Sequence, residues 1–273
     1  MSTTTKEAAH FEEHRRAFRP QGLPLTPPPA EQRVASCGQI GQIDAALQRW
    51  CRALRLRDPD TYAHSERVAE LAIALGCALD LDEPTLLHLR WSALLHDLGK
   101  VRIPDRILYK QGALTAREWE VMRQHPIWGY EIARAVPALP EDTQQAVLYH
   151  HERWDGQGYP YGLAGDEIPL LARILSVVDT WDAPTSQRPY HNPLPPHQVK
   201  RYLQEQAGAA LAPEIVAAFL QVSDALWKQP RRGIHLALPE SVRNQKRPTS
   251  SPFLSITAPW QPTRRWSRAL APA

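Results

Sequence analysis

Cysteine is scarce in this chain, and long apolar runs are absent. The 273 residues include three cysteines, at positions 37, 51 and 77, with no paired spacing. This pattern argues against a disulfide framework and against a structural zinc site of the CxxC type. No apolar stretch has the length of a membrane span, and the first residues lack the pattern of a signal peptide. We therefore expect a cytoplasmic protein in a reducing compartment.

Acidic residues are few at both ends of the chain and concentrated in its middle. Residues 229–273 carry 8 Lys/Arg and 1 Asp/Glu, net +7, and residues 1–57 carry 9 and 5, net +4. Residues 58–228 carry 15 and 23, net −8. An acidic middle suits a site that binds cations, whereas basic ends suit a polyanion or an acidic partner.

The two ends also hold 12 of the 26 prolines, a higher density than in the middle of the chain. We interpret residues 1–38 as a disordered leader and residues 229–273 as a basic, disordered tail containing Pro, Arg and Trp, because neither segment can form a packed core. The alternative is that these basic ends dock on a protein partner. We do not expect a nucleic-acid partner, and a homodimer stays open.

Between the ends, hydrophobic periodicity is that of helices. Val68, Leu71, Ala72 and Leu75 form an i, i+3, i+4, i+7 stripe, and no convincing alternating strand is present. The sequence therefore predicts an all-α fold, with a leading helix over residues 39–57 and a main helical domain over residues 58–228. One segment, residues 155–169, is rich in glycine and proline, which predicts a structured functional loop.

Histidines and carboxylates cluster within this helical middle. The cluster includes His64, the pair His96-Asp97, His125, the pair His150-His151, and Asp179. A lone buried histidine is most often a hydrogen-bonded core residue, but adjacent His-Asp and His-His pairs at helix ends have no packing rationale. Imidazole and carboxylate without thiolate favour Fe, Mn, Zn, Co or Ni. Two such metals can clamp a phosphate and ionise a water, so the cluster favours phosphodiester hydrolysis.

Two strings in the chain resemble known signatures. Residues 96–100, HDLGK, resemble the HD signature of the HD phosphohydrolase superfamily. Residues 150–160, HHERWDGQGYP, resemble the HHExxDGxGYP signature of the HD-GYP family. The resemblance covers about residues 58–225. It implies a helical HD-domain bundle with a non-helical GYP loop beside the metal site.

The same resemblance implies a set of metal ligands and two or three divalent transition metals, with Fe or Mn favoured over Zn, Co or Ni. Asp60 stands where some members have a glutamate that holds a third metal, and this carboxylate is one methylene shorter. The implied ligands are Asp60, His64, His96, Asp97, His125, His150, His151 and Asp179.

The substrate implied by the resemblance is the bacterial second messenger cyclic di-GMP, hydrolysed to pGpG, to GMP, or to both. Asp97 and Lys100 would act in catalysis, Tyr159 would line the pocket, and Lys100 and Arg188 would hold phosphates. His191 stands where the family often has lysine or arginine. Because histidine is mostly neutral at pH 7, this replacement would weaken phosphate binding at neutral pH. Two alternatives stay open: a non-catalytic effector that binds cyclic di-GMP, and a phosphohydrolase for another nucleotide or cyclic dinucleotide.

Overall fold

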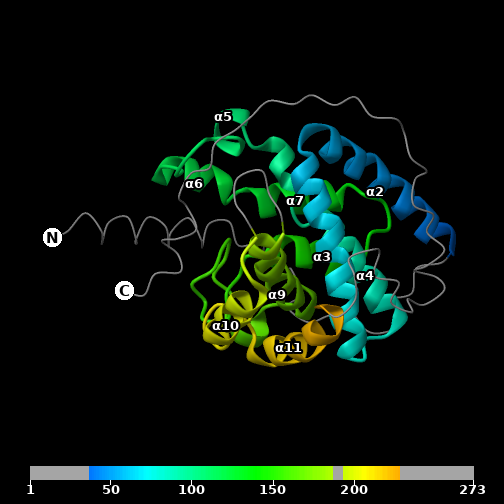
Figure 1. Cartoon of the computed structure of the whole chain (residues 1–273). Helices are drawn as coiled ribbons and strands as arrows, with labels where there is room; N and C mark the ends of the chain where they lie inside the picture. Colours follow the sequence, from blue (N-terminus) through cyan, green and yellow to red (C-terminus); the bar gives the residue numbers. More distant parts are fainter. Residues whose placement is uncertain (1–36, 187–192, 228–273) are drawn as a thin grey trace.

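Helices account for the regular structure of this protein (Figure 1). The structure, a computed structural model, describes residues 37–186 and 193–227. In chain order the elements are α2 (Cys37–Arg57), α3 (Pro59–Ala78), α4 (Glu83–Leu95), η2 (Leu98–Arg102), α5 (Asp105–Leu108), α6 (Ala116–Met122), α7 (His125–Arg134), α8 (Glu141–Tyr149), η3 (Gly165–Glu167), α9 (Leu170–Thr185), α10 (Pro196–Gln206) and α11 (Pro213–Trp227).

Local sequence explains where several of these helices begin. Asp58 caps α3 by accepting a hydrogen bond from the backbone N–H of Thr61 at 3.1 Å. Asp82 caps α4 in the same way, and each helix has a proline in its first turn, where no N–H partner is needed. At the start of α6, the predicted capping box of Thr115 and Glu118 is confirmed.

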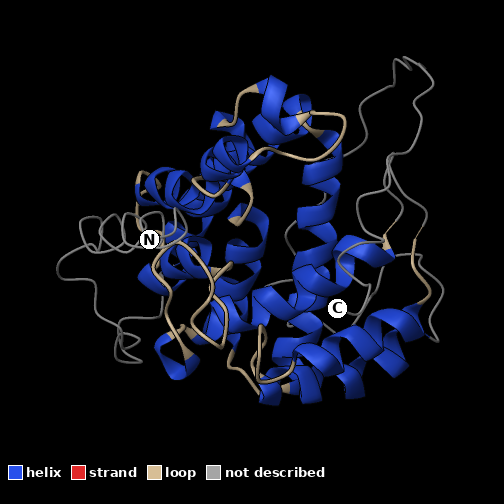
Figure 2. Cartoon of the chain, turned by 90° about the vertical axis from the view of Figure 1, so that its left-hand side faces the viewer, coloured by secondary structure: helices blue, strands red, loops and turns tan. Residues whose placement is uncertain are grey.

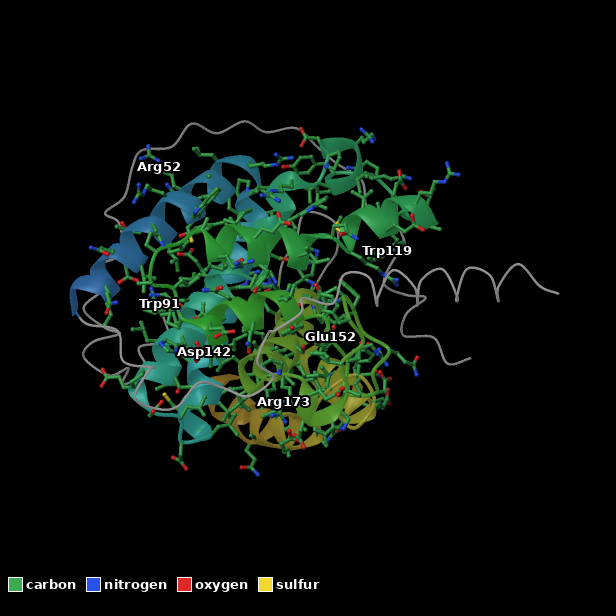
Figure 3. The ribbon with its side chains drawn as sticks, turned by 180° about the vertical axis from the view of Figure 1, so that it is seen from behind. Arg52, Trp91, Trp119, Asp142, Glu152 and Arg173 are labelled. Atoms are coloured by element: carbon green, nitrogen blue, oxygen red, sulfur yellow. The ribbon has the colours of Figure 1, made fainter. Side chains whose placement is uncertain are left out.

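Two apolar clusters hold the bundle together. One joins α3, α4 and α8 to α9, α10 and α11, and in it Trp181 meets Phe219 edge to face at 5.3 Å between ring centroids. The other joins α2 to α4, η2, α7 and α8 around the fully buried Trp91 (Figure 3). Helices α4 and α8 contribute to both clusters, so their C-terminal ends are fixed from two sides.

The predicted all-α fold is confirmed (Figure 2). The described residues contain two isolated β-bridges, Asp155 with Ala164 and Ala207 with Leu211, and no strand. Helix α2 begins at Cys37, two residues before the predicted start. The predicted leader and tail lie almost entirely outside the described residues, as do Arg188 and His191. Among the helices that the structure describes, none has the length and apolar character to cross a membrane.

Candidate metal centre

The predicted ligands lie mostly at the ends of helices. His96 directly follows α4 as its C-cap residue, and His150 directly follows α8 in the same way. His125 begins α7, and Asp97 directly precedes η2. The remaining ligands are His64 within α3, His151 after α8 and Asp179 within α9. Because α4 and α8 share their core packing, residues far apart in the sequence meet at one place.

These residues form two groups whose ligand atoms could each hold one metal ion. In the first group, which we call the mixed group, one ligand atom from each residue lies within 4.8 Å of the others, and its members are His64, His96 and Asp179. The second, which we call the imidazole group, meets the same limit and consists of His125, His150 and His151. Ring contacts join the two groups, with 5.1 Å between the ring centroids of His96 and His150.

Three of the histidines have their ring orientation set by a helix end. Nδ1 of His96 lies 2.8 Å from the carbonyl oxygen of Ala93, three residues earlier. The equivalent contacts are 2.9 Å from His125 to Met122 and 2.7 Å from His150 to Val147. A carbonyl can only accept, so each Nδ1 carries the proton and each Nε2 presents a lone pair. The acceptors belong to the last turns of helices, where carbonyls lack partners within the helix.

The free Nε2 atoms face one another, which is the arrangement that a metal requires. Nε2 of His96 is buried and has no hydrogen-bond partner in the described part of the chain. Nε2 of His125 and Nε2 of His150 are 3.2 Å apart, although neither carries a proton in this tautomer. Buried polar atoms are rarely left without a partner, because that costs about 1–3 kcal/mol per group. The residues present therefore fit divalent metal ions.

Asp97 lies between the two groups. Its Oδ2 is 3.6 Å from Nε2 of His96, and its Oδ1 is 3.5 Å from Nε2 of His125. One carboxylate oxygen thus faces each group, as expected for a bridging ligand. Lys100 donates to Oδ2 of Asp97 at 2.7 Å and is partly exposed. Burial acts to raise the pKa of Asp97, but the charges of Lys100 and the neighbouring histidines hold that pKa well below its ordinary value.

His64 is oriented by side chains rather than by a helix carbonyl. Its Nδ1 donates to Oδ2 of Asp182 at 2.7 Å, and its Nε2 lies 2.9 Å from Oδ1 of Asp179. Arg67 holds Asp182 by donating to both carboxylate oxygens, at 2.8 and 2.9 Å. The hydroxyl of Ser186 also donates to Asp182, at 2.7 Å. Carboxylates commonly orient metal-binding histidines in this way.

The orienting role of Asp182 was not predicted from the sequence. The residue lies within the region of family resemblance, but no role was expected for it. One signal was available, because Asp182 follows Asp179 by three residues and therefore lies on the same face of α9.

The pKa shift of His64 is opposite to the shifts in the imidazole group, whereas the pKa of His96 is lowered by burial like theirs. Burial is the largest influence on the imidazole group and lowers the pKa of His125 and of His151 to about 3. The pKa of His150 is also lowered, well below its ordinary value. For His64, burial acts in the same direction, but the hydrogen bonds to Asp179 and Asp182 outweigh it and raise the pKa. Without a metal, the imidazole group is therefore neutral at pH 7, whereas the two carboxylates stabilise the protonated form of His64 relative to a free imidazole.

A close backbone contact brings Asp97 to His125. A Cβ atom added to Gly99 would lie 1.9 Å from the carbonyl oxygen of His125 and 2.6 Å from the backbone nitrogen of Gly129. No side chain fits there, so glycine is required where η2 crosses the start of α7. The leucine and glycine of the HDLGK string thus serve packing, while its aspartate and lysine face the site.

The glycine-rich loop after His151 is organised by Glu152 (Figure 3). The buried carboxylate of Glu152 accepts hydrogen bonds from the backbone N–H groups of Tyr161, Gly162 and Leu163 at 2.6 to 3.1 Å. A Cβ on Gly158 would lie 2.3 Å from the nitrogen of Arg153, so the loop folds tightly back on its own start. Glu152 was not predicted as a functional residue, although it is the third residue of the HHExxDGxGYP string.

The folded loop places Tyr159 beside the imidazole group. The Tyr159 ring stacks on the His151 ring with 4.8 Å between centroids, and the backbone N–H of Tyr159 donates to the His151 carbonyl. The peptide bond between Tyr159 and Pro160 is cis. Asp60, by contrast, lies exposed in the first turn of α3 and belongs to neither ligand group.

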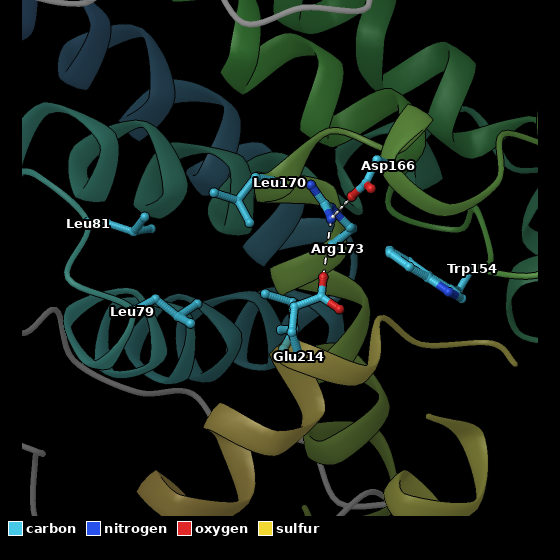
Figure 4. A pocket seen from close by; sticks show the side chains of 8 residues that line it. Leu79, Leu81, Trp154, Asp166, Leu170, Arg173 and Glu214 are labelled. Atoms are coloured by element: carbon cyan, nitrogen blue, oxygen red, sulfur yellow. Dashed lines mark hydrogen bonds and ion pairs between the residues drawn. The ribbon is translucent and has the colours of Figure 1, made fainter. Parts of the chain in front are cut away.

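A separate surface pocket of about 520 Å³ lies away from these ligands (Figure 4). Its walls include Leu79, Trp154 and Leu170, and Arg173 pairs there with Asp166 at 2.8 Å and with Glu214 at 3.2 Å. None of the predicted metal ligands lines it. The pocket is therefore distinct from the candidate metal centre.

Comparison with known proteins agrees with this geometry. The model of a family described as "HD domain" matches residues 50–215. A cyclic di-GMP phosphodiesterase from Thermotoga maritima is 40% identical over 177 residues, which are 64% of this chain and 48% of that protein. A 3'3'-cGAMP-specific phosphodiesterase from Vibrio cholerae is 38% identical over 170 residues, 62% of this chain and 33% of that protein.

Among solved structures, an HDG"Y"P protein from Bdellovibrio bacteriovorus is similar, with a TM-score of 0.51, 15% identity, and coverage of 82% of this chain and 81% of that chain. At this identity the likeness concerns the fold. The chain spans half or less of the length of the two curated relatives.

Proposed function

Because this chain belongs to the HD domain family, we propose that it is a metal-dependent phosphodiesterase that hydrolyses cyclic di-GMP to pGpG, to GMP, or to both. The observation that carries the proposal is the pairing of two ligand groups around one carboxylate, that of Asp97. Two metals held side by side suit the displacement of an alcohol from a phosphodiester by water. The relatives named for cyclic di-GMP support this substrate.

The mixed group would hold one divalent metal and the imidazole group a second, with Asp97 as the bridging ligand. When bound, the metals would lower the pKa of a water between them and neutralise charge on the phosphate. The donor set of imidazole and carboxylate favours Fe or Mn and also accepts Zn, Co or Ni. A third metal at Asp60 remains a prediction, since that carboxylate lies one helical turn before His64 and outside both groups.

The chain's own groups would bind and position the substrate. Lys100 is held on Asp97 with part of its side chain exposed, so its ammonium group can also neutralise the phosphate that is cleaved. Tyr159 extends the wall of the site outward from His151. Arg188 and His191 remain predicted phosphate-binding residues outside the described part of the chain.

A second candidate substrate has specific support. Several relatives are named as 3'3'-cGAMP-specific phosphodiesterases, at 28 to 38% identity. Because 3'3'-cGAMP has the same ring of two phosphates and differs in one purine, the same metal centre would serve both. A non-catalytic effector is the weaker alternative, since the described residues retain a ligand set for two metals.

The decisive experiment is chromatography of products after incubation of anaerobically purified protein with cyclic di-GMP, and in parallel with 3'3'-cGAMP. We expect cyclic di-GMP to be consumed faster, with pGpG or GMP appearing, in protein that holds about two transition-metal equivalents. Faster turnover of 3'3'-cGAMP would reassign the substrate. Tight binding of cyclic di-GMP without product, in fully metallated protein, would identify an effector.

A further inference from the structure

Arg123 is exposed and lies beside Tyr159, close to the candidate metal centre. It directly follows the last residue of α6 and precedes His125 by two residues. Its guanidinium carbon lies 5.4 Å from the centroid of the Tyr159 ring. Tyr159 in turn stacks on His151 of the imidazole group. A contiguous series of contacts therefore leads from the metal ligands through Tyr159 to an exposed cation.

Arg123 differs from the other cations at this centre because it has no anionic partner among the described residues. Lys100 pairs with Asp97 at 2.7 Å, and Arg67 binds both carboxylate oxygens of Asp182. Within residues 37–186 and 193–227, the Arg123 guanidinium forms no ion pair and contacts the face of Tyr159. Its charge is thus available to a ligand that approaches the metal centre along Tyr159.

A cyclic dinucleotide carries two phosphates, and the metals would bind only the one that is cleaved. The phosphate that is cleaved would lie on the metals beside Lys100. The other needs a cation at the wall of the site, and a guanidinium can bind a phosphate through two parallel hydrogen bonds. Arg123 has the required charge, exposure and position beside the loop tyrosine.

We propose that Arg123 binds the second, non-cleaved phosphate of the cyclic dinucleotide and that Tyr159 holds the guanidinium in place. This inference rests on the proposed phosphodiesterase function and adds a substrate-binding residue to it. The sequence predicts phosphate binding by Lys100, Arg188 and His191 and gives Arg123 no role. The contact that identifies Arg123 joins residues 36 positions apart and exists only in the folded chain.

The test compares Arg123→Gln with wild type on two kinds of substrate. Cyclic di-GMP has two phosphates, whereas bis(p-nitrophenyl) phosphate has one and reports on the metals alone. We expect Arg123→Gln to raise KM for cyclic di-GMP by about tenfold or more, because a charge-assisted contact is lost. Its metal content, and its kinetics on bis(p-nitrophenyl) phosphate, should equal those of wild type.

Matched variants separate direct phosphate binding from a change in net charge and from bracing of Tyr159. Arg117→Gln removes an exposed arginine from α6, the helix that Arg123 directly follows, and should leave KM unchanged, which controls for net charge. Arg123→Lys should recover part of the loss, since lysine keeps the charge without the two-point geometry. In a Tyr159→Ala background, Arg123→Gln should still raise KM. No further effect there would mean that Arg123 only braces Tyr159 and would overturn the proposal.

Cyclic di-AMP serves as a third substrate, because it has the same two phosphates without guanine. A phosphate contact predicts the same proportional loss for both cyclic dinucleotides in Arg123→Gln. A loss confined to cyclic di-GMP would show recognition of guanine instead and would overturn the phosphate assignment. An unchanged KM for cyclic di-GMP in Arg123→Gln would also overturn the phosphate assignment.

Failure of the proposed function is distinguishable from these outcomes. It would appear in the wild-type protein, as cleavage of bis(p-nitrophenyl) phosphate with no turnover of any cyclic dinucleotide. That result would overturn the function and the Arg123 assignment together, whereas an active wild type with an unaffected Arg123→Gln variant would overturn the assignment alone.

Discussion

The mixed group and the imidazole group contain three ligands each, but different forces hold them. In the imidazole group, His125 and His150 are oriented by carbonyls of helix ends three residues earlier in the chain. In the mixed group, His64 is oriented by Asp182, which lies 118 residues away and is itself held by Arg67. The histidines oriented in the imidazole group therefore depend on local backbone, whereas the mixed group combines His96, also set by a local carbonyl, with His64, set by an ion-pair network formed by tertiary packing.

The two groups also differ in charge. The imidazole group is neutral, because burial lowers the pKa of its histidines. The mixed group includes Asp179, whose carboxylate is stabilised by His64 so that its pKa falls below the ordinary value in spite of burial. An anionic ligand strengthens the attraction for a cation, so we expect the mixed group to bind its metal more tightly.

The largest expected effect comes from substitution of Asp97, since its carboxylate faces both ligand groups. Its loss should weaken metal binding at both groups, so that they no longer differ. Asp97→Asn keeps the shape but removes one oxygen ligand and the negative charge between the metals. We expect hydrolysis to fall by at least about a hundredfold and the metal content to drop below two equivalents. Steady-state kinetics and elemental analysis on the same sample measure both. Full activity in this variant would show that Asp97 is not the bridge.

Asp182→Asn should weaken the mixed group while sparing the imidazole group. Loss of an orienting carboxylate typically lowers metal affinity by about 10- to 100-fold. We therefore expect one of two metal equivalents to be lost at a chelator concentration that wild type tolerates. Equal loss of both metals would contradict the division into two groups.

The matched control for this variant is Asp142→Asn. Asp142 (Figure 3) accepts a hydrogen bond from Nδ1 of the buried His88 at 2.8 Å. This is the same kind of carboxylate–histidine pair as Asp182 with His64, but His88 belongs to neither ligand group. The control should lose stability but no metal.

The pH dependence of stability provides a second check on Asp182. Burial acts to raise the pKa of Asp182, but hydrogen bonds from His64 and Arg67 lower it to about 2. Its contribution to stability is complete above the unfolded pKa of about 3.9 and is lost as pH falls through about 2.

Glu152→Gln tests the loop that adjoins the imidazole group and should have a moderate effect. The charged carboxylate accepts from three backbone N–H groups, and hydrogen bonds to charged groups contribute about 1.5–3 kcal/mol. We expect the free energy of unfolding, measured by thermal denaturation, to fall by a comparable amount. KM for cyclic di-GMP should rise, because Tyr159 would lose its fixed position. Metal content should stay at two equivalents. A loss of metal would mean that the loop also holds His151 in place.

The smallest effect is expected from the basic C-terminal segment. Deletion of residues 231–273 removes the whole +7 charge and none of the described contacts of either group. We expect the helical circular dichroism signal and the rate of hydrolysis to change little. A deletion that unfolds the protein, or one that alters metal content, would show that this segment belongs to the core.

The fold and the ligand set differ in how far sequence could predict them. Helical periodicity and the Thr115–Glu118 capping box predicted helices, because such signals are local. The adjacent pairs at residues 96–97 and 150–151 predicted a metal centre, because two polar side chains at one helix end have no packing role. Asp182, Glu152 and Arg123 were not given their roles, since each acts through partners that the sequence does not place nearby.

By itself, the sequence determined which chemical groups are present and that helices would carry them: imidazoles and carboxylates without thiolate, within an acidic helical middle. Tertiary structure alone decided how those groups divide into two sets of three around Asp97. The physical reason is that helical periodicity sets the direction of a side chain relative to its own helix. The distance between side chains of different helices depends on packing, here of α4 and α8 between two apolar clusters and of Gly99 against His125.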